Sequence, residues 1–261
     1  MLPAHRLRSW IAAASVLLSS GVALASSGIG PGELADRHFR ALFGFSALEA
    51  YEVESGPVRA SFAIARRYTE RETELLIDIL SPLELRRSAA LLRSRPGEGD
   101  ELIVYWPTLR RAIRVPAGPL EEQPIFEVFP LHELRPTTAA ELEWTEAERE
   151  TIRGVRCRVV RGVPRRRGVW YDRLELAISP DLPFALEARY SRGGRMRSRV
   201  TIDPREIRDF EGRSLPSHRR IERADDGHRV DLWLRRVVEG ATLPHRLFTR
   251  HNLRVQHFPR F

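Results

Sequence analysis

The chain has 261 residues, of which 42% are apolar, and a formal net charge of +8 at pH 7. This length and composition can bury a sizeable core, as one large all-β domain or two small domains. A single cysteine excludes an intrachain disulfide framework. All 43 basic residues are arginine, which coding bias explains; the charge indicates weak attraction to anionic membrane surfaces rather than nucleic-acid binding.

The amino terminus has the pattern of a secretory signal peptide. Arg6 and Arg8 precede a run of apolar and small residues, 11–25, that ends in Ala25. The run is shorter than the roughly 20 apolar residues of a membrane-spanning helix. We expect residues 1–25 to be removed after Ala25, which would leave the mature chain in the periplasm of a Gram-negative bacterium. The next residue is Ser26, so no cysteine is available for lipidation.

Residues 31–43 are expected to form an amphipathic helix. Pro31 suits the first turn, and Gly44 suits the end. Apolar residues and one histidine recur at helical spacing between them: Leu34, Ala35, His38, Phe39, Leu42 and Phe43.

Residues 61–115 have the period of two that is typical of strands. Expected strands are 61–65, 73–80 and 102–106, the last with 111–115 as its hairpin partner. Residues 86–94 fit a strand or a helix equally well.

The middle of the chain differs from its flanks. Residues 116–150 are interrupted by prolines and become acidic and helix-prone from 139 to 150. They are expected to form a long connection with a short helix, placed like a lid.

The strand pattern returns after Gly154 and continues almost to the carboxyl end. Asp225-Asp226-Gly227 is a strong hairpin signal. A spacing of about ten residues predicts a meandering antiparallel sheet, curled around one apolar face. The expected strands are 155–163, 169–178, 184–190, 196–203, 214–223 and 230–238.

Residues that support catalysis or metal binding do not form any recognisable motif. Cys157 lies in an alternating run and is expected to be structural. His245, His251 and His257 are expected to be solvated, with the last two in a tail, rather than to bind a metal. Residues 165–167 are three arginines in a loop, which is expected to be a solvated hairpin tip, with a contact to anionic lipid or to a partner's acidic surface as the alternative. We expect no enzyme activity, no metal and no cofactor.

Three stretches resemble the LolA-like outer-membrane lipoprotein-sorting family, in order along the chain. They are the strand 75–82 ending in Ser-Pro, the hairpin 101–115, and 243–249 followed by Leu253. In the hairpin, Trp106-Pro107 and Arg110-Arg111 match the family pattern. Residues 124–134 depart from it, because the family's glycine and serine are missing there.

The resemblance implies a mainly β fold. It is a curled antiparallel sheet forming an incomplete, half-open β-barrel, with helices covering the concave face, in a single domain over 26–261. Such proteins hold the acyl chains of lipids or lipoproteins during passage across the periplasm, and relatives work with inner-membrane transporters of the resistance-nodulation-division type. Transient contact with a membrane surface would accompany this role. The alternatives are a protein-interaction or envelope-stress-sensing module on the same fold, and, last, a hydrolase.

Large apolar residues on the expected helix, strands and middle segment are candidates to line the lipid cavity. The same residues would equally make a closed core. The candidate lipid-binding residues are Phe39, Leu42, Phe43, Leu75, Ile77, Ile79, Val104, Trp106, Phe126, Phe129, Trp170, Leu174 and Leu186.

Overall fold

A computed structural model describes residues 28–95, 98–115, 124–125, 129–130, 134–166, 169–255 and 257–259. The expected signal peptide, 1–25, lies outside the described residues. Within the described ranges, no helix is long and apolar enough to cross a membrane.

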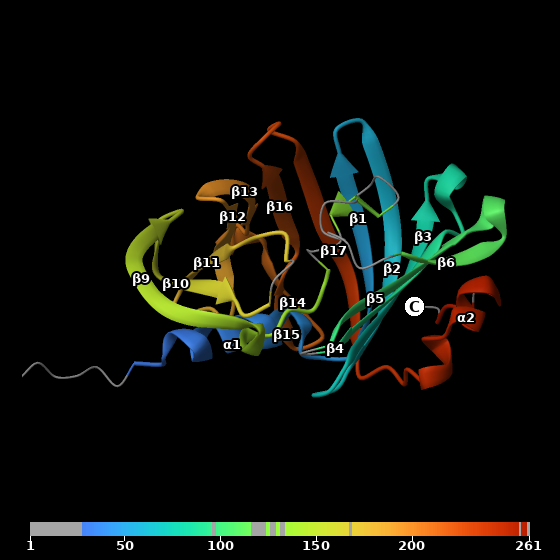
Figure 1. Cartoon of the computed structure of the whole chain (residues 1–261), viewed down its shortest axis with the longest axis horizontal. Coiled ribbons are helices and arrows are strands. Elements are labelled where there is room, and N and C mark those ends of the chain that lie inside the picture. Colours follow the sequence, from blue (N-terminus) through green and yellow to red (C-terminus); the bar gives the residue numbers. More distant parts are fainter. Residues whose placement is uncertain are drawn as a thin grey trace, which may run out of the picture.

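The fold is dominated by one antiparallel sheet of thirteen strands (Figure 1). Neighbours along the sheet are in the order β6-β5-β4-β3-β2-β1-β17-β16-β13-β12-β11-β10-β9, so β6 and β9 are its two edges and the sheet is not closed. The strands are β1 (Ala47–Ser55), β2 (Val58–Tyr68), β3 (Thr73–Ser81), β4 (Ala89–Arg95), β5 (Gly99–Trp106), β6 (Arg111–Val115), β9 (Leu142–Ile152), β10 (Val155–Pro164), β11 (Arg173–Ile178), β12 (Ala185–Arg192), β13 (Arg195–Thr201), β16 (His218–Arg223) and β17 (Arg229–Glu239).

Smaller elements complete the described chain. Two short hairpins are β7 (Pro124–Ile125) with β8 (Phe129–Pro130), and β14 (Ile207–Phe210) with β15 (Arg213–Pro216). The helices are α1 (Pro31–Phe43) and α2 (Arg250–Val255). Single 3-10 turns occur at Leu83–Leu85, Pro107–Leu109, Ala139–Glu141, Pro204–Glu206 and His245–Leu247.

Helix α1 confirms the prediction from helical spacing. It begins at Pro31, and Gly44 closes it by donating its backbone N–H to the carbonyl of Arg40. The face with Leu34 and Phe39 is buried. The helix packs on β9, β10 and β11 and runs beneath that half of the sheet (Figure 1).

The sheet buries apolar side chains on two faces, because successive residues of a strand point to opposite sides. On β3, Leu75 and Ile77 join the large cluster under α1, whereas Leu76 joins a second cluster. We call the first side the inner face and the second the outer face. The carboxyl-terminal segment, residues 243–258 with α2, covers the outer face of β2–β6.

The expected short helix in 139–150 is wrong. Only Ala139–Glu141 forms a helical turn, and Leu142 starts the edge strand β9, which pairs with β10. Trp144 lies opposite Gly162, where a Cβ would come within 2.8 Å of its ring. This close packing and the ladder of hydrogen bonds outweigh the helix propensity of the glutamates and alanine.

Other differences are smaller. Residues 86–94, which fit either structure, form β4, and strand β1 was not anticipated. The expected strand 214–223 is divided at Ser217, whose hydroxyl donates to the backbone carbonyl of Glu206. The expected tail around His251 is helix α2.

Candidate functional site

Most candidate lipid-binding residues meet in one place. Phe39, Phe43, Leu75, Ile77, Ile79, Val104, Trp170 and Leu174 belong to the inner cluster, and Leu42 and Trp106 pack against it half-buried. Phe126 lies outside the described residues, and Phe129 is in β8, where only the backbone is described.

Leu186 is the exception among the described candidates. Between β11 and β12, Ala177 pairs with Glu187 and Ile178 with Ala185, so Leu186 is the extra residue of a β-bulge. A bulge breaks the alternation of side chains along a strand. Leu186 therefore packs with Cys157 and other residues in a separate cluster.

A cavity of about 450 Å³ lies beside the second half of α1. This volume is within the range of roughly 300–1,000 Å³ that is typical of ligand pockets. The cavity is bordered by apolar side chains of the helix and by a largely polar rim from three segments: Asp36, Phe39, Arg40, Phe43, Gly44, Tyr68, Glu70, Thr73, Pro136, Thr137, Thr138 and Ala140.

Among the candidates whose side chains are described, Phe39 and Phe43 alone border this cavity. Leu75, Ile77 and Leu174, from the strands, are fully buried and form packed core behind it. The rim at 136–140 lies within the connection 116–150 that was expected to be placed like a lid, but none of its residues was a candidate, because no periodic pattern marks a loop that only tertiary contacts position.

The middle of α1 is held by hydrogen bonds to the β11–β12 connection and to the first residue of β12. The Arg37 guanidinium donates from Nη2 to the carbonyls of Ser179, at 3.3 Å, and Leu182, at 2.7 Å. His38 Nδ1 accepts the backbone N–H of Ala185 at 3.0 Å. Burial, with a smaller effect of the Arg219 charge, lowers the pKa of His38 to about 3, so the ring is neutral and acts as an acceptor.

The facing rim is also held by specific contacts. Arg135 is ion-paired with Asp100 and, at 2.9 Å, with Glu141. Glu141 also accepts the backbone N–H of Thr138 in a capping box, and Trp144 donates its indole N–H to the carbonyl of Ala139 at 2.8 Å. The cavity thus lies between a fixed rim and the half of α1 that Arg37 and His38 do not hold.

Chemistry of other kinds has little support in the described residues. Ser55 Oγ lies 2.8 Å from His228 Nε2, but His228 is exposed in a hairpin and neither residue borders the cavity. Cys157 is buried, and burial raises the pKa of its thiol, which disfavours the nucleophilic thiolate. Within the described ranges, no three His, Cys, Asp or Glu side chains are grouped to hold a metal ion.

A family model described as "-like: Uncharacterized protein" matches residues 71–255, and the chain belongs to this family. Among solved structures, the chain is similar to a domain from Vibrio parahaemolyticus assigned to outer membrane lipoprotein sorting, with 13% identity, a TM-score of 0.73 and coverage of 84% of this chain and 99% of that one. A LolA superfamily protein from Nitrosomonas europaea is similar with 17% identity, a TM-score of 0.68 and coverage of 86% and 99%. The chain has the LolA-like fold.

The chain is also similar to a DUF1329 family protein from Desulfovibrio piger, with 16% identity, a TM-score of 0.75 and coverage of 85% of this chain and 97% of that one. No curated protein matches the chain. The expected half-open antiparallel sheet is confirmed, both by these LolA-like neighbours and by the unpaired edges β6 and β9.

Proposed function

We propose that this protein is a carrier that binds the acyl chain of a lipid or lipoprotein in the bacterial envelope, without catalysing a reaction. The observation that carries the proposal is the cavity between the second half of α1 and the rim at 136–140. Its apolar floor includes Phe39 and Phe43, and it opens from the apolar inner face of an unclosed sheet. Burial of an acyl chain against such an apolar surface is favourable by about 25 cal/mol for each Å² of apolar area removed from water.

The structural neighbours support this proposal. The Vibrio parahaemolyticus domain is assigned to outer membrane lipoprotein sorting and shares the fold over nearly its whole length. The sequence supports an envelope location through the signal-peptide pattern in residues 1–25, with 26–261 as the mature domain. We extend the proposal to lipoprotein sorting with an inner-membrane transporter of the resistance-nodulation-division type.

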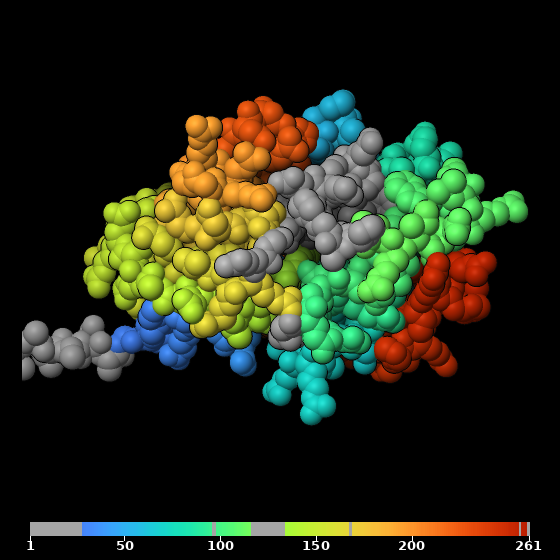
Figure 2. Space-filling view, in the orientation of Figure 1, coloured from blue at the N-terminus to red at the C-terminus, as the bar shows by residue number. Residues whose placement is uncertain are grey.

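Two exposed turns support transient contact with a membrane. The turn with Leu83, 76% exposed, and the turn with Leu109, 60% exposed, lie at the same end of the sheet (Figure 2). Exposed arginine pairs accompany them, Arg86-Arg87 and Arg110-Arg111. Apolar tips flanked by cations are suited to an anionic bilayer surface. Changing both leucines to Asp should weaken co-sedimentation with vesicles containing anionic phospholipid, and unchanged sedimentation would exclude this surface.

Native mass spectrometry tests the carrier function. The mature chain would be purified from periplasm under mild conditions and examined for co-purified lipid, then for uptake of added phospholipid and lipopeptide. We expect a lipid adduct that is lost in Phe43→Glu and retained in Met196→Glu, a matched change at an exposed residue of the β12–β13 hairpin.

A clean apo mass with no uptake of either added probe would contradict the carrier function. It would favour the protein-interaction module instead.

A further inference from the structure

A buried arginine lies on the inner face, directly beneath the end of α1. Arg66 of β2 is 1% exposed. It donates from Nε to Glu49 Oε1 at 2.9 Å and from Nη2 to Glu49 Oε2 at 3.1 Å. Tyr51 donates its hydroxyl to the same carboxylate at 3.0 Å. The Glu49 side chain therefore already receives three hydrogen bonds.

The third nitrogen of the Arg66 guanidinium, Nη1, takes no part in the pair with Glu49. Arg66 Nη1 is buried, and within the described part of the chain no atom meets it with hydrogen-bond geometry, although the Tyr51 hydroxyl lies near enough to interact with the guanidinium. The guanidinium carbon lies 5.3 Å from the centre of the Phe43 ring, which covers it. A buried N–H of a charged group is rarely without an acceptor in native proteins. An anionic ligand that supplied an acceptor here would form a strong, charge-assisted hydrogen bond.

A second arginine comes to the same region from the opposite side. Arg219 of β16 is 7% exposed and borders two small hollows of about 30 and 20 Å³. The smaller hollow also touches Glu49 and Tyr51. Burial and the Glu49 charge raise the pKa of the Tyr51 phenol, so its hydroxyl remains a hydrogen-bond donor. The charges of Arg219 and Arg66 act in the opposite direction and lower this pKa, which places both guanidinium groups near Tyr51.

Phe43 separates these polar groups from the large cavity. Its side chain borders the cavity of about 450 Å³ as well as both small hollows beside Arg219. It belongs to the last turn of α1, away from the contacts of Arg37 and His38 that fix the helix. A different rotamer of Phe43 would open the cavity toward the small hollows that Arg219 borders, and it would uncover the Arg66 guanidinium beneath the ring.

We propose that the cargo is an anionic acyl lipid whose carboxylate or phosphate binds Arg66 Nη1 and Arg219 once Phe43 moves aside, while its chain occupies the cavity. Guanidinium groups bind these two anions through charge-assisted, often paired hydrogen bonds. Low polarity around the site strengthens each bond. This inference rests on the proposed carrier function and adds the charge of the cargo to it.

Calorimetric titration of the mature protein with three probes of equal chain length tests this inference. Palmitate supplies a carboxylate, hexadecyl phosphate a phosphate and hexadecanol a neutral head group. We expect at least one of the two anions to bind about tenfold or more tightly than hexadecanol, and the tighter anion identifies the source of the charge. Arg219→Gln should bring the anion to the affinity of hexadecanol.

Arg235→Gln is the matched control, because it removes the same charge from an exposed arginine that is paired with Glu52. It should leave the preference unchanged. Arg66→Met should also abolish the preference; if that variant does not fold, the wild-type comparison and Arg219→Gln decide the question.

Equal binding of all three probes would overturn the anionic cargo while leaving the carrier function intact. A preference that survives Arg219→Gln would overturn the assignment of the site. Failure of every probe to bind would contradict the carrier function itself, and the anionic cargo with it.

Discussion

The two faces of the sheet are covered in different ways. The outer face of β2–β6 is covered by residues 243–258, where Phe248 and Leu253 are fully buried, and the hollow found beneath this segment is only about 10 Å³. The inner face is covered by α1, which borders a cavity of about 450 Å³. One cover is packed along its length, whereas the other leaves space at one end.

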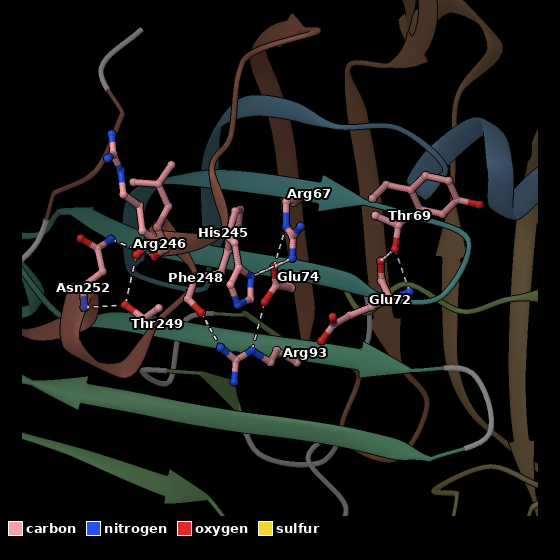
Figure 3. Close-up of polar contacts among 12 residues, drawn as sticks. Arg67, Thr69, Glu72, Glu74, Arg93, His245, Arg246, Phe248, Thr249 and Asn252 are labelled. Carbon is pink, nitrogen blue, oxygen red and sulfur yellow. Dashed lines mark hydrogen bonds and ion pairs between the residues drawn. The ribbon is translucent and has the colours of Figure 1, made fainter.

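The outer cover is held by buried charge (Figure 3). Glu74 is 0% exposed and accepts from Arg67 Nε at 2.7 Å and from Arg93 Nε at 3.1 Å. Arg93 also donates to the backbone carbonyl of Phe248, and the Arg67 guanidinium lies 5.6 Å from the centre of the Phe248 ring. This network fixes the covering segment to β2, β3 and β4.

The inner cover is held by hydrogen bonds at its middle, before its last turn. Arg37 and His38 bond to the β11–β12 connection, and the last turn of α1 is held chiefly by apolar contacts of Phe39 and Phe43. Apolar contacts have no preferred direction, so an acyl chain can replace them without leaving polar groups unpaired. The difference teaches that the fold gives one face a cover held by buried charge and the other a cover whose last turn is held by apolar contacts, which the proposed carrier function uses as the part a ligand displaces.

The largest effect is expected from removing the central side chain of the outer cover. Phe248→Ala should lower the free energy of unfolding by about 3–5 kcal/mol, as is usual for a fully buried phenylalanine. Val255→Ala, in the same segment but 44% exposed, should change it by less than about 1 kcal/mol. Urea denaturation measures both. A loss below about 1 kcal/mol for Phe248→Ala would contradict the packed outer cover.

A smaller effect is expected at the middle of α1, where hydrogen bonds hold it. Arg37→Ala removes the hydrogen bonds to Ser179 and Leu182, at a cost of about 1.5–3 kcal/mol for bonds made by a charged donor. Hydrogen exchange should become faster throughout α1. The control Arg40→Ala removes only an exposed ion pair with Asp36 and should have little effect. Equal exchange in both variants would contradict a helix held at its middle.

The smallest effect is a pH dependence at the outer cover. Burial, opposed by the Arg86 charge, raises the pKa of Asp78 to about 6, and its side chain borders the hollow with Leu253 and Phe258. Its folded-state pKa is above the unfolded value, so the folded protein holds this proton more tightly, and stability falls as the pH rises from about 4 to about 6.

Asp78→Asn should therefore be more stable than the wild type at pH 7 and equal to it at pH 4. After allowance for partial exposure, the expected difference at pH 7 is about 1–2 kcal/mol. Urea midpoints at the two pH values give this difference. A variant that gains nothing between pH 4 and pH 7 would show that Asp78 does not titrate in this way.

Elements governed by local pattern could be predicted from the sequence. The spacing of Leu34, Phe39 and Phe43 identified α1 with its observed bounds, and the period of two correctly predicted the strand at 73–80, where Leu75 and Leu76 lie on opposite faces. The three stretches 75–82, 101–115 and 243–249 with Leu253 gave the LolA-like resemblance, which the structural neighbours confirm. These features depend on residues within a few positions of each other.

Elements governed by distant contacts could not be predicted. The acidic edge strand β9 has the composition of a helix and depends on pairing with β10. Leu186 leaves the inner face because of a bulge that alternation does not reveal. The rim of the cavity depends on the pair between Arg135 and Asp100, which are 35 positions apart. Loop position and bulges are decided by tertiary structure, so the sequence identified the helix side of the site and the connection 116–150 opposite it, but not which residues of that connection form the wall.

Tryptophan quenching by an acyl chain carrying bromine near its end tests the central claim, that a chain is held beside α1 on the inner face. Trp144 lies on this side, 6.1 Å from Phe39 between ring centres. Trp233 points to the other side of the sheet, between the inner residues Leu232 and Leu234, and stacks on His218. Two variants would each keep one of these tryptophans, with the others changed to Phe. The account predicts saturable quenching of Trp144 and none of Trp233; equal quenching of both, or none of Trp144, would contradict it.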